Sequence, residues 1–238
     1  MITKICLFSI IYLSFFLSGV NAQFLDDVKK IIDPGKGGLT EKDAADGIKE
    51  ALVKGTGESV QIVSKLNGYF SNPEIKIPFP PEASEIESKL RSIGLGNKVD
   101  EVILSLNRAA EDAAKGAQSI FVGAITKMTV TDAIQIVKGK NDAATQYLSK
   151  TTSPELKAKF SPVIKASLDK VEATRLWEDL VSTYNQIPFV KKQNEDLPGY
   201  VTDKAIAGLF IMIAKEELKI RKDPIARTTE LLKKVFGN

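Results

Sequence analysis

The chain of 238 residues is long enough for one domain or two small ones, and its 43% hydrophobic and 26% charged residues are typical of a protein with a buried core. Its 33 basic and 30 acidic residues give a net charge of +3 spread along the chain, which argues against a nucleic-acid-binding surface. Without histidine, and with one cysteine at Cys6, it lacks the residues of Ser-His-Asp and Cys-His active sites and the usual ligands of zinc, copper and haem. We therefore predict no cofactor.

The first 22 residues have the pattern of a secretory signal peptide. Lys4 precedes the apolar stretch 5–17, which is shorter than a typical membrane span. Small residues then lead to Ala22, so we predict cleavage between Ala22 and Gln23 and export of the chain to the periplasm or the medium. The mature chain is then expected to have no transmembrane span, and an uncleaved anchor is the alternative.

The rest of the sequence predicts a short extension followed by one domain. Residues 23–38 end in a glycine-rich run that lacks the spacing of a phosphate-binding loop, so we interpret them as an N-terminal extension and linker. Residues 39–238 are predicted to form a single helical domain.

The first part of this domain predicts two helices and then an extended strap. Thr40 has the position of an N-cap, and helical spacing of apolar residues indicates one helix ending near Gly55 and a second over 58–66. The stretch 72–81 contains four prolines, which favour extended backbone. Its apolar residues alternate, so one side is expected to lie on apolar surface; they are Ile75, Ile77 and Phe79.

The remaining segments have helical patterns bounded by capping residues. Gly94 and Leu95 have the pattern of a glycine C-cap, and Thr129 with Asp132 that of a capping box. Predicted helices cover about 82–93, 97–115, 120–128, 129–139, 142–149, a segment starting at Ser153-Pro154, 162–184, 200–221 and 223–236. The run 205–214 is apolar on every side, as in a helix surrounded by others. The predicted fold is all-α: a compact multi-helix bundle of about ten helices with one extended proline-rich strap and no β-sheet.

Several stretches, in a fixed order, resemble a bacterial family of exported domains of unknown function. They are LTEKDAADGIKEAL (39–52), NPEIKIPFP (72–80), LSLNRAAEDAA (104–114), KMTVTDAIQIVKG (127–139), DAATQYL (142–148) and the stretch from Tyr200 to Gly237. The resemblance covers about residues 39–237. It implies an exported, all-helical, single-domain bacterial protein without an assigned activity, so no functional residue is transferred from it.

The polar residues of the helix predicted over 97–115 are the first candidates for a binding site. Asn107 lies beside the apolar stripe of this helix, so its amide needs a partner if it is buried. That partner is either a neighbouring main-chain group or a ligand. Arg108 and Glu111 are spaced to form an ion pair, which is common on exposed helix faces and marks no site by itself.

Two further candidate groups lie in the C-terminal half. Glu217 and Arg221 are one helical turn apart in the favourable order, which indicates a structural corner. If Glu216 or Glu217 instead faced Glu111 across a cleft, the two carboxyl groups would permit glycosidase-type hydrolysis. Trp177 and Tyr184 share a helix side and form either core packing or an aromatic wall of a groove.

The function favoured by these patterns is non-catalytic. We interpret the chain as a binding or interaction module of the bacterial cell envelope that holds an apolar small molecule or an envelope protein. A carboxylate-dependent, glycosidase-like hydrolase is the first alternative, and a self-assembling structural protein is the second. The candidate binding residues are Asn107, Arg108, Glu111, Trp177, Glu217 and Arg221; no catalytic residue and no metal ligand is assigned.

Overall fold

The computed structural model describes residues 40–186 and 196–222. Contacts within the chain divide it into two units, 1–40 and 41–238, and every described helix belongs to the second. The predicted signal peptide, the N-terminal extension and the helix predicted from Asp223 lie outside the described residues.

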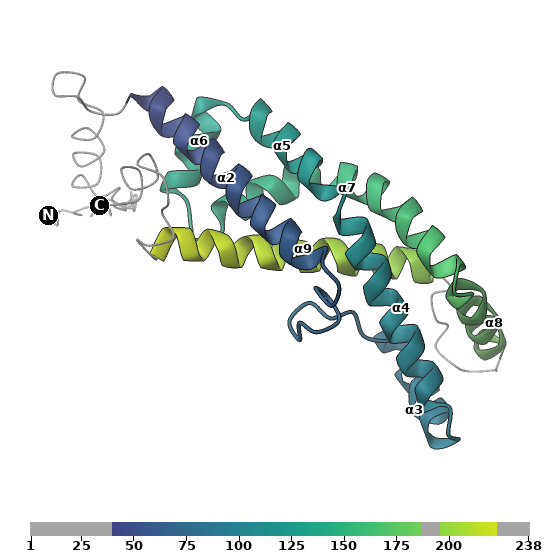
Figure 1. The fold of residues 1–238 in the computed structure, drawn as a ribbon. Coiled ribbons are helices and arrows are strands. Elements are labelled where there is room, and N and C mark those ends of the chain that lie inside the picture. The colour runs from purple at the N-terminus through teal and green to yellow at the C-terminus, as the bar shows by residue number, and fades with distance from the viewer. Residues whose placement is uncertain (1–39, 187–195, 223–238) are drawn as a thin grey trace, which may run out of the picture. The chain divides into compact units, whose positions relative to one another are not determined.

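The described residues form eight α-helices, one 3₁₀ turn and no strand, which confirms the all-helical prediction (Figure 1). The helices are α2 (Glu41–Val63), α3 (Ser84–Ser92), α4 (Gly96–Ala114), α5 (Ala117–Lys127), α6 (Val130–Lys138), α7 (Ala143–Asp169), α8 (Ala173–Asn185) and α9 (Leu197–Lys222), with the turn η1 (Pro81–Ala83) before α3. Eight rather than about ten α-helices are described, partly because pairs of predicted helices are continuous.

The predicted break near Gly55 is wrong, because α2 continues through two glycines. A Cβ atom on Gly55 would lie 3.5 Å from side-chain atoms of Glu216 and Ile220 on α9. A Cβ on Gly57 would lie 3.0 Å from the side-chain amide of Gln118 on α5. These glycines therefore occupy places where other helices approach α2 closely, and packing keeps the helix intact despite their low helix propensity.

The boundaries predicted around two prolines are also wrong. Pro154 and Pro162 both lie inside α7, and the buried side chains Leu148, Leu156 and Phe160 form one stripe that runs past Pro154. Each proline removes a single helical hydrogen bond, and the packed stripe outweighs that loss. The predicted long helix 162–184 is instead divided at residues 170–172, where Glu172 has a positive φ of 55°.

Two local predictions are confirmed. The Thr129 hydroxyl accepts a hydrogen bond from the Asp132 N–H, and the Asp132 carboxylate accepts one from the Thr129 N–H, so the capping box starts α6. After α3, Gly94 has a φ of 85°, and the N–H of Leu95 donates to the carbonyl of Leu90. This is a Schellman motif, and it turns the chain from α3 into α4.

Residues 64–80 connect α2 to η1 without helix or strand. The segment contains turns up to Ser71 and another over 73–75, so it is not a single extended stretch. Ile75, Ile77 and Phe79 are all buried, while the residues between them are exposed. We call residues 64–80 the 64–80 loop.

The core lies between α4, α7 and α9, with α2 and α5 packed on them. Figure 1 shows α9 in yellow passing beside α2, α4 and α7. Ala205, Leu209 and Ile213 of α9 are buried, but Ile211 is 41% exposed. The run 205–214 is therefore not enclosed on all sides as predicted.

Among the described helices, α9 alone is long and apolar enough by itself to cross a membrane, and 44% of its most apolar window is buried inside the protein. The bent pair α5 and α6 passes the same test when it is taken as one span. A core helix of a globular protein has the same composition, and α9 contributes Val201 and Leu209 to the core.

Candidate functional site

Glu217 on α9 holds the first turn of α7. Its carboxylate accepts hydrogen bonds from the N–H groups of Ala144, at 3.0 Å, and Thr145, at 2.9 Å, and from the Thr145 hydroxyl at 2.8 Å. These N–H groups belong to the start of the helix, where no main-chain carbonyl is available to them. The negative charge also complements the positive end of the α7 dipole.

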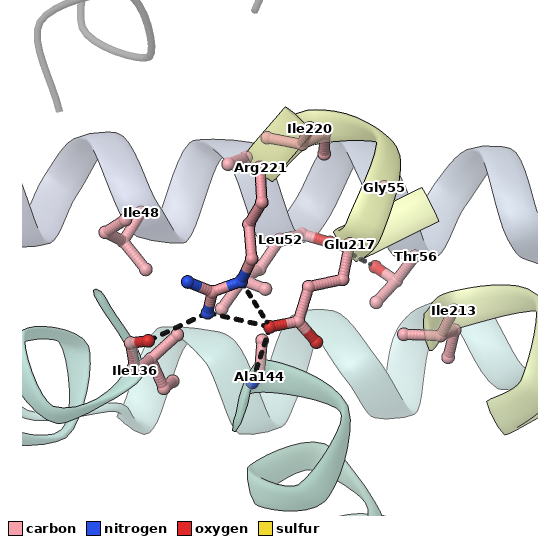
Figure 2. Close-up of a pocket in the computed structure, with 11 residues that line it drawn as sticks. Ile48, Leu52, Gly55, Thr56, Ile136, Ala144, Ile213, Glu217, Ile220 and Arg221 are labelled. Atoms are coloured by element: carbon pink, nitrogen blue, oxygen red, sulfur yellow. Dashed lines mark hydrogen bonds and ion pairs between the residues drawn. The ribbon is translucent and has the colours of Figure 1, made fainter. Parts of the chain in front are cut away.

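Arg221 completes the same cluster from the next turn of α9 (Figure 2). Its guanidinium donates to the Glu217 carboxylate at 2.8 and 2.9 Å and to the Ile136 carbonyl at 2.8 Å. That carbonyl lies in the last turn of α6, where a cation is favourable. Glu217 and Arg221 therefore join the end of α6 and the start of α7 to α9, as the predicted structural corner requires.

A small cavity lies next to this pair and is lined mostly by apolar side chains of α2, α6 and α9, as Figure 2 shows. Its volume is about 30 Å³, with Glu217 and Arg221 on its polar side. Since one water occupies roughly 10 to 15 Å³ of such a cavity, there is room for about two waters. It is too small for an apolar ligand of the size of a benzene ring.

Glu111 on α4 performs a similar role for the 64–80 loop. It is 4% exposed, and its Oε1 accepts hydrogen bonds from the N–H groups of Tyr69, at 3.1 Å, and Phe70, at 3.2 Å. Its Oε2 is paired with Arg108 on the same helix. Arg108 also donates to the side-chain oxygen of Asn67, which has a positive φ of 69° at the start of the turn.

Tyr69 ties the same turn to α9. Its ring is fully buried, and its hydroxyl donates to the carbonyl of Ala205 at 2.7 Å. Burial, followed by the charge of Glu111, raises the pKa of the Tyr69 hydroxyl, which therefore stays protonated as a donor. Gly208 lies below the ring, where a Cβ would come within 2.8 Å of Tyr69 Cε1.

Asn107 anchors the other end of the loop. Its side-chain oxygen accepts from the Ile77 N–H at 2.9 Å, and its amide nitrogen donates to the Ile77 carbonyl at 2.8 Å and to the Ile103 carbonyl at 2.7 Å. Both amide hydrogens and the acceptor of this fully buried side chain are therefore used within the protein. Of the two interpretations, the structure shows the main-chain partner.

Trp177 on α8 is 5% exposed and packs edge-on against Phe79, with ring centroids 5.4 Å apart. This is core packing between α8 and the end of the 64–80 loop. The side chain of Tyr184, predicted on the same side, lies outside the described part of the structure.

The acidic residues are not arranged as the hydrolase alternative requires. Glu111 and Glu217 hold different main-chain segments, line different cavities and are each paired with an arginine. Glu216 lies next to Glu58 of α2, and burial followed by this neighbouring carboxyl raises its pKa. Lys219 contacts Glu216 at 3.3 Å and acts in the opposite direction. No described group of three or more acidic residues could hold a metal ion.

A larger concavity of about 480 Å³ lies between the end of α2, α4 and the end of α7. We call it the α4–α7 groove. Its lining comprises Ser64, Leu66, Leu104, Ser105, Arg108, Ala109, Glu111, Asp112, Lys115, Ser167 and Val171. Leu66 is 74% exposed and Val171 52% exposed, so apolar side chains stand at its edge.

Sequence reasoning missed the residues that connect these sites. Tyr69, Ile77 and Glu58 act on partners more than 29 positions away, so no local spacing marks them. The groove was missed for the same reason, because three separate segments form it. The sequence contains one signal for this arrangement. Asn107 and Glu111 place an amide and a carboxylate one helical turn apart, where both can bind main-chain groups of the same loop.

Together these observations define an all-helical protein whose buried charged side chains fasten loop and helix ends, with an open groove beside α4 and α7. The chain belongs to the family described as "Protein of unknown function (DUF4197)", whose family model matches residues 38–237. Neither the curated proteins nor the solved structures contain a significant match to it.

Proposed function

We propose that this chain is a non-catalytic binding or interaction module of the bacterial cell envelope, and that the α4–α7 groove is its binding surface. The observation that carries this proposal is the use of the buried polar groups. Glu111, Glu217 and Asn107 all form hydrogen bonds with main-chain groups of other segments. The two buried glutamates therefore stabilise the fold, which favours a non-catalytic role. The proposed location in the envelope is based on the signal-peptide pattern of residues 1–22.

The groove has the properties of a surface for a protein segment. Its volume of about 480 Å³ lies within the range of ligand sites, whereas the cavity beside Glu217 holds about two waters. Leu66 and Val171 offer apolar contact at the edge, and Arg108 and Asp112 supply charges of both signs. Exposed apolar side chains next to polar and charged ones are a common composition of protein interfaces. We therefore favour a partner protein over an apolar small molecule.

The proposal is tested by photo-crosslinking in the cells that make the protein. A benzophenone amino acid replaces Leu66 at the groove, and in a matched variant it replaces Ser119, which is exposed on α5. We expect a discrete crosslinked product from position 66 that is absent from position 119. Val171→Asp, which places a charge at the rim without touching the core, should reduce the yield several-fold.

Three results would contradict the proposal. The first is equal crosslinking from both positions, or none from position 66. The second is a product that mass spectrometry identifies as two copies of this chain, which would favour the self-assembling structural protein. The third is turnover of a glycoside, ester or peptide by the purified protein that Glu216→Gln abolishes, which would favour the hydrolase.

A further inference from the structure

A turn that follows α2 contains Asn67-Gly68, the only Asn-Gly pair in the sequence. Asn67 has a φ of 69°, a left-handed conformation in which asparagine is enriched among residues other than glycine. Gly68 leaves no space for a side chain, because a Cβ atom there would collide with the carbonyl oxygens of Ile62 and Val63. The chain therefore needs asparagine or a similar residue at 67, and glycine at 68, to turn away from α2.

The side chain of Asn67 is open to water and is held at one atom. Asn67 is exposed, its Oδ1 accepts a hydrogen bond from Arg108 Nη2 at 2.7 Å, and its amide nitrogen donates to no described residue. The guanidinium thus faces the oxygen that gains negative charge when a nucleophile attacks Cγ. The Gly68 N–H donates to the Lys65 carbonyl at 2.9 Å. This bond closes an exposed turn at a helix end, where local opening is frequent, so the Gly68 nitrogen is available as that nucleophile.

We propose that Asn67 is a site of spontaneous deamidation. Asparagine is among the thermolabile residues of proteins, and a glycine after it puts no side chain in the way of the attack. The Gly68 nitrogen loses a proton to the solvent and bonds to Cγ of Asn67, which closes a succinimide ring. The bond from Cγ to the amide nitrogen breaks, and this nitrogen takes up a proton and leaves as ammonia. One water then opens the ring at either of its carbonyl carbons.

The two products differ in the main chain. Opening at Cγ gives aspartate on the original main chain, with a new negative charge beside Arg108, which already pairs with Glu111. Opening at the main-chain carbon gives isoaspartate, in which the chain passes through Cγ and is one atom longer before Tyr69. Leu66 and Arg108 line the α4–α7 groove, so both products change the charge at its edge. The reaction itself does not depend on the function proposed for the groove.

Peptide mapping of the purified full-length chain, incubated at neutral and at mildly alkaline pH, tests the proposal. Trypsin releases residues 66–76 as one peptide, which contains Asn67 and Asn72. Asn72 precedes Pro73, whose nitrogen carries no hydrogen and cannot attack, so it is a control within the same peptide. Tandem mass spectrometry assigns a gain of one water less one ammonia to either position. Digestion in water with a heavy oxygen isotope marks any deamidation that arises during digestion.

We expect the modified fraction at position 67 to rise with time, and several-fold faster at alkaline pH, because the attacking nitrogen must lose its proton. Asn97 is also exposed but precedes Lys98, whose side chain hinders the attack, so it should react many-fold more slowly. Asn67→Gln keeps the amide but would close a larger ring, and should stay unmodified over the same period. Asn67→Asp should co-elute on ion exchange with one of the new forms of the incubated chain. Circular dichroism should show unchanged helix content in both variants.

Three results overturn the proposal. One is an intact Asn67 in the folded chain over a period in which a synthetic peptide of residues 61–73 deamidates, because the fold then protects the pair. Another is equal modification of Asn67 and Asn97, because glycine at position 68 then has no part in the reaction. The last is the same mass gain in peptide 66–76 of Asn67→Gln, which excludes attack by the Gly68 nitrogen on an asparagine side chain.

Discussion

Glu111 on α4 and Glu217 on α9 each accept hydrogen bonds from two consecutive main-chain N–H groups, and each pairs with an arginine on its own helix. Their surroundings differ. The side chain of Arg221 is 11% exposed and donates to carbonyls at the end of α6, whereas that of Arg108 is 34% exposed and lies in the α4–α7 groove. The junction region around Glu217 is therefore closed, and the loop region around Glu111 is open on the side of its arginine.

Packing density differs in the opposite way, because the loop region, which has the more exposed ion pair, is packed more tightly than the junction region. At the loop region, the ring of Tyr69 lies directly on Gly208, with no space for a further methyl group. At the junction region, Gly55 faces α9 at ordinary contact distance beside a cavity of about 30 Å³. At these two regions the more buried ion pair therefore lies beside looser packing, and the more exposed pair beside tighter packing.

The largest predicted effect comes from removing each carboxylate. Glu217→Ala should lower the free energy of unfolding by about 3 to 5 kcal/mol, because it removes the carboxylate that offsets the charge of Arg221 and accepts from the α7 N–H groups. Glu111→Ala should cost about 1 to 3 kcal/mol, the penalty for unsatisfied buried N–H groups, because Arg108 can turn to water. Urea unfolding of both variants measures this difference. Equal losses would show that the exposure of the arginine does not matter.

The arginines test the same difference from the other side. Arg221→Ala should cost about 2 to 3 kcal/mol, since Glu217 keeps its α7 donors but loses its charged partner. Arg108→Ala should cost at most about 1 kcal/mol, as for ion pairs near the surface. Denaturant midpoints at constant m value give the comparison. A larger loss for Arg108 than for Arg221 would reverse the assignment of open and closed regions.

The two glycines test the packing. Gly208→Ala should destabilise the protein by about 1 to 3 kcal/mol, because the added methyl group overpacks against Tyr69 and Ile75. Gly55→Ala should stabilise it by about 0.5 to 1 kcal/mol, because α2 gains helix propensity without a close contact. Thermal unfolding measures both. Gly123→Ala, where a Cβ would meet nothing within 4 Å, is the control for propensity alone.

The smallest effect concerns Glu216 beside the junction region. Burial and Glu58 raise its pKa in the folded protein, so this carboxyl contributes less stability as the pH rises through the interval above its ordinary value. Glu216→Gln should therefore gain roughly 0.5 kcal/mol at pH 7, the size of a like-charge repulsion on a helix surface. The gain should vanish at a pH below the ordinary glutamate range, where Glu216 is protonated in both the folded and the unfolded protein. Urea unfolding of both proteins at pH 3 and pH 7 measures this difference.

Local chemistry allowed the sequence to predict some parts of the fold. The capping box at Thr129 and the glycine cap at Gly94 depend on residues within five positions of each other, and both are confirmed. The pairing of Glu217 with Arg221 was predictable for the same reason. These features require no knowledge of the tertiary structure.

The errors have the opposite origin. Pro154 and Gly55 normally weaken helices, but buried contacts with distant segments keep α7 and α2 continuous. The partners of Glu111 and Asn107 lie on the 64–80 loop, more than 29 positions away, and could not be assigned from spacing. The exposure of Ile93 could not be predicted, because the exposure of an apolar residue is a property of the folded surface.

Asn107 and Glu111 are one turn apart on α4, so the chain that leaves at Phe70 returns close to its starting point at Ile77. Pro73 and Glu74, between these anchors, are exposed. Lengthening a closed loop raises its entropic cost by only about 0.6 kcal/mol per doubling. The bond between Pro73 and Glu74 is therefore a suitable place to graft an epitope tag or a split-reporter peptide without dismantling the helices around it.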